Sequence, residues 1–190
     1  MTPTFIRSVS SIAEFPAEET RPQIALVGRA NAGKSSLINS LANQKGLSHA
    51  SSTPGRTRLI NLFDFGQFVL VDLPGYGFSR ASKMERKGFE KLIYDYLSES
   101  AKLMGVIVIL DSGVGATDLD MEMFAFLRDM QMPHLAVANK VDKLSRSAAM
   151  AALERIEGQV QPSEVVAHSN VTKVGRGDVI LWIKKTVSGK

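Results

Sequence analysis

The sequence contains no cysteine, which excludes disulfides, thiolate metal sites and a cysteine nucleophile. It has only three histidines, His49, His134 and His168, and their scattered positions do not match the spacing of metal ligands. We therefore expect each histidine in a loop or at a strand end. No run of eighteen apolar residues occurs, and residues 1–7 lack the apolar core of a signal peptide. The expected location is the cytoplasm, with no membrane contact.

The composition is that of a globular protein. Of the 190 residues, 44% are hydrophobic and 22% are charged, which predicts one domain with a sizeable core over residues 23–190, preceded by a lead-in segment over residues 1–22. The formal charge is +4, and the isoelectric point is near 9.4. A polyanionic partner is compatible with this charge but is not established by it.

A glycine-rich stretch at residues 28–35 follows an apolar run and precedes a helical pattern. Strand, glycine loop and helix in this order are the context of a phosphate-binding P-loop. Backbone N–H groups of the loop and of the first helical turn would bind phosphate oxygens, Lys34 would reach the β- and γ-phosphates, and the Ser35 hydroxyl would ligate Mg²⁺. The alternative, a glycine turn followed by an N-capping serine, explains the flanking patterns less well. The eight residues are Gly28, Arg29, Ala30, Asn31, Ala32, Gly33, Lys34 and Ser35.

Strand and helix patterns alternate along the chain. They predict an α/β P-loop NTPase fold with a mainly parallel six-stranded sheet, one antiparallel edge strand and helices on both faces. A turn at Gly66-Gln67 would join two strands into the antiparallel hairpin, and residues 1–20 would form either a strand or a short flanking segment. Expected strands cover residues 23–27, 59–65, 68–72, 105–111, 134–138 and 164–168, and expected helices cover residues 36–41, 84–99, 145–157 and 178–187, with a further helix capped at residues 117–120.

Two further motifs follow predicted strands and should lie at the same edge of the sheet as the P-loop. The first is Asp72-Leu73-Pro74-Gly75, in which Asp72 would hold Mg²⁺ directly or through water and the Gly75 N–H could meet the γ-phosphate. The second is Asn139-Lys140-Val141-Asp142. Its carboxylate can accept two N–H bonds from guanine, whereas adenine would leave it unpaired at a cost of ~1–3 kcal/mol. Asn139 would tether the base loop, and the Lys140 stem would lie on the base plane.

Together with Thr53-Pro54-Gly55-Arg56-Thr57 and the continuation Tyr76-Gly77-Phe78, these motifs resemble the EngB (YihA/YsxC-type) ribosome-biogenesis GTPases of bacteria, within the TrmE-Era-EngA-EngB-Septin-like family. The resemblance covers nearly the whole chain. It implies a single G domain over residues 23–190 that binds GTP and GDP, a switch role in ribosome biogenesis, a link to cell division and septation, and the large ribosomal subunit with its rRNA as partner of an expected monomer.

The resemblance also assigns site residues. It implies that Thr57 ligates Mg²⁺ beside Ser35, so that Lys34, Thr57 and Gly75 would serve catalysis. Ser169 would support the guanine, and Asn31 is suggested to help bind K⁺ near the β- and γ-phosphates. The nucleotide would also be lined by residues 55–59 and by the loop after the last strand, namely Gly55, Arg56, Thr57, Arg58, Leu59, His168, Ser169 and Asn170.

Tyr76 stands where many GTPases carry the glutamine that orients the attacking water, which predicts slow hydrolysis. The loops at residues 43–58 and 73–87 would be ordered by GTP and released after hydrolysis. The second loop begins a basic cluster that would suit RNA phosphates or would simply form a solvated helix face. Two other functions stay open: a P-loop kinase or ATPase, and a nucleotide-dependent binding module with negligible turnover. The cluster consists of Arg80, Lys83, Arg86, Lys87 and Lys91.

Overall fold

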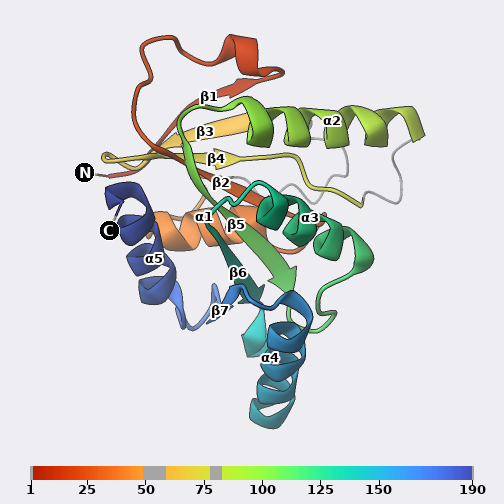
Figure 1. The fold of residues 1–190 in the computed structure, drawn as a ribbon. Coiled ribbons are helices and arrows are strands. Elements are labelled where there is room, and N and C mark those ends of the chain that lie inside the picture. Colours follow the sequence, from red (N-terminus) through yellow and green to blue (C-terminus); the bar gives the residue numbers. More distant parts are fainter. Residues whose placement is uncertain (1, 49–58, 78–82, 190) are drawn as a thin grey trace.

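The computed structural model describes residues 2–48, 59–77 and 83–189. Seven strands form one sheet with helices on both faces (Figure 1). The strands are β1 (Thr4–Val9), β2 (Gln23–Gly28), β3 (Ile60–Asp64), β4 (Val69–Asp72), β5 (Leu103–Asp111), β6 (His134–Asn139) and β7 (Glu164–His168). The helices are α1 (Lys34–Ala42), α2 (Lys83–Glu99), α3 (Asp118–Asp129), α4 (Arg146–Val160) and α5 (Arg176–Ser188), with 3₁₀ turns η1 (Ile12–Glu14) and η2 (Val141–Lys143).

The sheet has the order β1-β3-β4-β2-β5-β6-β7, and only β3 runs antiparallel to its neighbours. The predicted α/β fold is confirmed, but the sheet has seven strands instead of six. The additional strand is β1 from the lead-in segment, which pairs with β3 and takes the edge position that we expected for the hairpin. Phe5 packs edge-on against Phe63 across this pair, and Val9 is buried. The weak alternation of residues 1–20 did not decide between a strand and a flanking segment.

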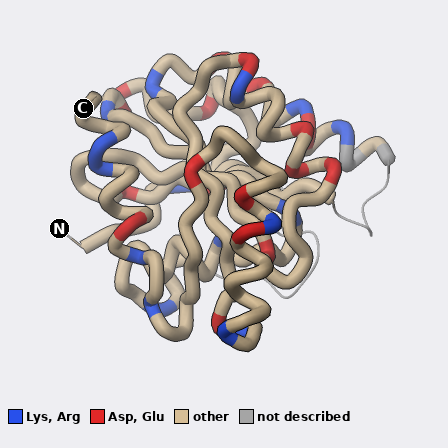
Figure 2. Tube along the Cα trace, turned by 60° about the horizontal axis from the view of Figure 1, so that its bottom comes forward, with Lys and Arg blue, Asp and Glu red and all other residues tan. Residues whose placement is uncertain are grey.

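The two faces of the sheet are covered by different helices. α2, α3 and α4 contribute buried residues to one core cluster, and α1 and α5 contribute to the other. No helix in the described ranges is both long and apolar enough to cross a membrane. Both basic and acidic residues lie along α2 (Figure 2).

The register of the sheet brings three loops to one edge. β2 pairs in parallel with β4, where Leu26 lies opposite Asp72, and with β5, which in turn pairs with β6. Because parallel strands end at the same edge, the P-loop, the loop after Asp72 and the loop after Asn139 meet there. This edge carries the candidate functional site.

Candidate functional site

The predicted P-loop connects β2 to α1, as expected. Gly33 is the residue before the helix and has a φ of 107°, a conformation that L side chains rarely adopt. A Cβ atom at this position would lie 2.2 Å from Asn139 Nδ2, so only glycine fits. The helix that follows leaves first-turn N–H groups without intrahelical partners, which makes this turn a suitable anion site.

The opposite charges of Lys34 and Asp72 interact at the P-loop. Burial lowers the pKa of the Lys34 ammonium, and the charge of Asp72 opposes that shift. Burial raises the pKa of Asp72 to about 6, against the opposing charge of Lys34 and a hydrogen bond from Asn61. Lys34 Nζ lies 3.4 Å from the Gly28 carbonyl oxygen. The pair therefore places a half-buried cation beside a buried carboxylate at the carboxyl end of β2 and β4.

The Asp72 carboxylate is oriented by a short chain of polar side chains across the sheet. Ser8 Oγ donates to Asn61 Oδ1 across 2.6 Å, and Asn61, which lies opposite Asp72 in the β3–β4 pair, bonds to the carboxylate. Asp72 Oδ1 is buried and has no hydrogen-bond partner among the described residues. A free carboxylate oxygen close to a helix that begins with Lys34-Ser35 suits Mg²⁺, which prefers oxygen ligands. The residues present therefore fit this ion, although no cluster of three histidine, aspartate or glutamate side chains occurs among those described.

The loop after β4 runs along the P-loop. Ala30 N–H donates to the Tyr76 carbonyl oxygen across 2.9 Å, and Arg29 and Tyr76 form an isolated parallel bridge. A Cβ atom on Gly75 would lie 3.0 Å from Lys34 Nζ and 3.2 Å from Ala30 N, so glycine allows this close approach. Leu73 and Pro74 are buried, and Leu73 belongs to the core.

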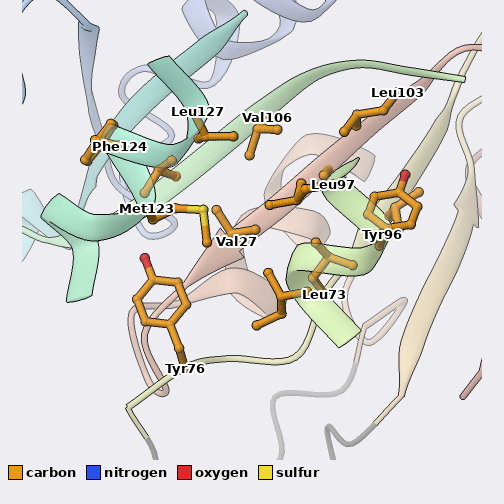
Figure 3. Packing of buried hydrophobic residues seen from close by; sticks show 14 of the residues in the cluster. Val27, Leu73, Tyr76, Tyr96, Leu97, Leu103, Val106, Met123, Phe124 and Leu127 are labelled. Carbon is orange, nitrogen blue, oxygen red and sulfur yellow. The ribbon is translucent and has the colours of Figure 1, made fainter. Parts of the chain in front are cut away.

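The Tyr76 side chain points into the core beneath α3 (Figure 3). Its hydroxyl donates to Asp120 Oδ1 across 2.7 Å, and only 6% of the residue is exposed. Val27, Leu73 and Met123 belong to the same cluster. In this position the ring serves packing, and its hydroxyl already has a partner.

The loop after β6 is tied to the P-loop by two side chains. Asn139 Nδ2 donates to the Ala32 carbonyl oxygen across 2.9 Å. Lys140 Nζ donates to the Asn31 carbonyl oxygen across 2.6 Å and to Asp111 Oδ2 across 2.7 Å. Two of the predicted motifs, separated by more than a hundred residues in the chain, are thus in direct contact.

Asp142 and the loop after β7 are also joined. Ser169 Oγ donates to Asp142 Oδ1 across 2.6 Å, and the Ser169 hydroxyl oxygen accepts from the N–H groups of Val171 and Thr172. Asp142 lies in η2 and is exposed, whereas Asn170 is half-buried. His168 ends β7 with a fully buried ring, and His134 begins β6, so both lie at strand ends as predicted.

Some predicted site residues fall outside the described ranges. They are Gly55, Arg56, Thr57 and Arg58, together with His49 and Arg80. Leu59 directly precedes β3 and is 37% exposed.

Three elements of the site were missed from the sequence. Asn61 had a usable signal, because the predicted turn at Gly66-Gln67 already places residue 61 opposite Asp72. The Tyr76–Asp120 bond and the contact of His168 with Asn139 and Ser40 had no local signal.

Comparison with known proteins agrees with this geometry. A family model described as "50S ribosome-binding GTPase" matches residues 23–140. "Probable GTP-binding protein EngB" from Pelotomaculum thermopropionicum is 46% identical over 187 residues, which are 96% of this chain and 94% of the relative. The protein of that name from Lactobacillus helveticus is 36% identical over 188 residues, covering 95% of each chain.

Solved structures share the fold. The crystal structure of a probable GTP-binding protein engB aligns with a TM-score of 0.75 at 20% identity, covering 88% of this chain and all of that one. Era in complex with MgGDPNP and nucleotides 1506–1542 of 16S ribosomal RNA aligns with a TM-score of 0.69 at 24% identity, covering 87% of this chain and 56% of that one.

Proposed function

This chain belongs to the EngB family of GTP-binding proteins, and from that premise we propose that it is a slow GTPase that acts, as a monomer, as a nucleotide-controlled switch in assembly of the large ribosomal subunit. The observation that carries the proposal is the hydrogen bond from Asn139 to the Ala32 carbonyl oxygen. This bond joins the P-loop, which would bind the phosphates, to the loop after β6, which would bind the base, so one nucleotide can span both loops. Gly28–Ser35 would bind the phosphates, and Asn139, Asp142 and Ser169 would hold the guanine.

The reaction would be hydrolysis of GTP to GDP and phosphate. Lys34 would stabilise the charge that develops between the β- and γ-phosphates, and the Gly75 N–H would bind the γ-phosphate. Ser35 and Thr57 would hold Mg²⁺, and Asp72 would hold it directly or through water. When bound, the ion would neutralise phosphate charge. Because the Tyr76 hydroxyl is bonded to Asp120, the Tyr76 side chain does not take the role of the water-orienting glutamine. This supports slow turnover by the isolated protein.

K⁺ is a second proposed cofactor, placed beside Asn31. The Asn31 side chain is exposed, while its carbonyl oxygen accepts from Lys140. A cation here would supply charge that other GTPases receive from an arginine finger. Turnover measured in KCl and in NaCl at equal ionic strength tests this. Equal rates in the two salts would contradict it.

The proposed partner is ribosomal RNA of the large subunit. The family description names the 50S subunit, and the Era structure contains 16S ribosomal RNA. Lys87 is exposed on α2, and Lys91 is bonded to Asp95, so Lys91 already has an acidic partner within the helix. Co-sedimentation with 50S subunits in the GTP and GDP states is the test, and binding that ignores the nucleotide would contradict the switch.

Asp142→Asn tests the base assignment. We expect GTP affinity to fall about tenfold or more, because the amide cannot accept both guanine N–H bonds, and XTP to gain what GTP loses. Asp129→Asn, an exposed change at the end of α3, is the matched control. Unchanged GTP preference would contradict the assignment, and ATP binding as tight as GTP binding would favour a P-loop ATPase or kinase.

Phosphate release separates the remaining alternative. A GTPase switch should release phosphate slowly alone and faster with ribosomal subunits. Binding of GTP without release under either condition would instead indicate a binding module.

A further inference from the structure

His168 is a buried histidine with both ring nitrogens engaged. Its Nδ1 lies 2.9 Å from Asn139 Oδ1, and its Nε2 lies 3.2 Å from Ser40 Oγ. An amide oxygen can only accept, so Nδ1 must carry the proton. Nε2 is then a lone-pair acceptor for the Ser40 hydroxyl. One neutral tautomer satisfies every polar atom of this contact.

The surroundings keep the ring neutral. Burial, together with the charge of Lys173, lowers the pKa of His168 to about 4, against the opposing charge of Asp142. The hydrogen-bond directions are therefore constant at neutral pH.

Four groups form a path, which we call the His168 relay: the Ala32 carbonyl oxygen and the side chains of Asn139, His168 and Ser40. Ala32 lies in the P-loop, and Ser40 lies on the helix that the P-loop begins. Asn139 at the end of β6 bonds to Ala32 in the P-loop and to His168 at the end of β7, and His168 bonds to Ser40 in α1.

Ser40, the relay residue in α1, is also contacted by Arg176. Arg176 Nε, at the start of α5, donates to the Ser40 carbonyl oxygen across 2.6 Å, and its Nη2 donates to that of Leu41 across 3.1 Å. These bonds therefore link β6, β7 and the start of α5 to the P-loop helix.

We propose that His168 is a positioning residue for guanine-nucleotide binding that acts through Asn139. The His168 Nδ1–H group donates to the Asn139 amide oxygen, so the Asn139 amide nitrogen must face the Ala32 carbonyl oxygen. The reverse orientation would set Oδ1 against that carbonyl, with two acceptors in contact. His168 performs this role without touching the nucleotide, in contrast to the binding role expected from the sequence. The inference rests on the proposed GTP function.

Matched substitutions separate the two ring nitrogens. In His168→Asn the amide nitrogen replaces the Nδ1 donor, and we expect GDP and GTP affinities within about threefold of the unmodified protein. In His168→Gln the amide reaches toward Ser40, and in His168→Phe no donor remains. Both should weaken binding about tenfold, the size expected when a buried acceptor loses its donor. Equal affinity of the unmodified protein and His168→Phe would overturn the proposal.

His134→Asn is the control. This histidine is also bonded at both ring nitrogens, to the Met132 carbonyl oxygen and to Ser163 Oγ, but it lies at the opposite end of β6 from Asn139. Its replacement should leave nucleotide affinity unchanged. A loss as large as that of His168→Phe would attribute the effect to general damage of the sheet and overturn the proposal.

A double-mutant cycle tests whether the effect passes through Asn139. In the Asn139→Ala background, His168→Phe should cause no further loss of GTP affinity, because the amide that it orients is gone. Additive losses would overturn the proposal.

The tautomer itself can be observed without nucleotide. Two-bond ¹⁵N–¹H spectra of the unmodified protein should show the His168 proton on Nδ1, with His134→Asn helping the assignment. A proton on Nε2 would overturn the relay even if GTP binds. Failure of the unmodified protein to bind GTP, with the proton on Nδ1, would instead overturn the proposed function.

Discussion

The Tyr76 hydroxyl donates a hydrogen bond to Asp120 Oδ1 across 2.7 Å, and this bond joins the loop after β4 to the first turn of α3. Asp120 Oδ2 accepts from the backbone N–H and the hydroxyl of Thr117, which completes the cap of α3. One buried carboxylate thus anchors both a helix start and a loop beside the P-loop. We expected Tyr76 to affect hydrolysis, but its side chain holds the loop after β4 against α3.

Tyr76→Phe should lower the free energy of unfolding by about 1–3 kcal/mol, because Asp120 Oδ1 is left without its donor. The hydrolysis rate should stay within about twofold, since the hydroxyl faces α3. Urea denaturation and phosphate release measure the two effects. Tyr94→Phe, at a ring that packs edge-on against Phe126, is the control. A large loss of hydrolysis at unchanged stability would instead assign the hydroxyl to the chemistry.

Gly33→Ala should weaken nucleotide binding about tenfold or more, since backbone strain of about 1–3 kcal/mol is added to a clash with Asn139. Gly189→Ala is a matched control, because Gly189 also has a positive φ, of 65°, but no atom lies within 4 Å of the added Cβ. It should lower stability and leave affinity unchanged. Fluorescent nucleotide titration distinguishes them, and equal losses of affinity would refute the steric explanation.

Asn61→Ala should raise the Mg²⁺ concentration for half-maximal hydrolysis about tenfold, because residues that orient a metal-site carboxylate tune metal affinity by that order. Ser8→Ala removes only the bond that orients Asn61 and should have a smaller effect. Ser10→Ala, at an exposed serine bonded to Glu14, is the control. An unchanged Mg²⁺ requirement in Asn61→Ala would show that Asp72 needs no such orientation.

His168 makes stability depend on pH. Its folded-state pKa of about 4 lies below the ordinary value of 6.5, so the unfolded chain binds the proton first as the pH falls. The contribution of neutral His168 to the free energy of unfolding is fully present above pH 6.5. It is lost between about pH 6.5 and 4, where the free energy of unfolding falls by about 3 kcal/mol in total. Urea denaturation of the unmodified protein and of His168→Asn across this range should show the larger loss in the unmodified protein. Parallel curves would contradict this.

Most of the fold could be predicted, because each central strand is a short apolar run and each helix has one apolar face. β5, for example, is almost wholly apolar in sequence and is buried along most of its length. β1 could not be assigned, since a half-exposed edge strand such as Thr4–Val9 carries little alternation and depends on β3 for its pairing.

The P-loop and the two loops that meet it could be predicted because their residues are contiguous in sequence and follow strands. Contacts between single side chains of distant segments could not. The Tyr76–Asp120 bond spans 44 positions, and the His168–Ser40 bond spans 128. Only the packing of α3 and α1 on the sheet brings these pairs together.

The pairing of β1 with β3 has a practical consequence for handling the protein. An open strand edge offers unsatisfied N–H and C=O groups to any other extended chain. With β1 in place, those groups of β3 are occupied, and the edge is formed by β1, whose register shifts between Phe5 and Arg7, an irregularity that hinders pairing with another chain. Proteolytic trimming of residues 1–9 would uncover the groups of β3, and the shortened protein should then self-associate through its sheets and precipitate during concentration.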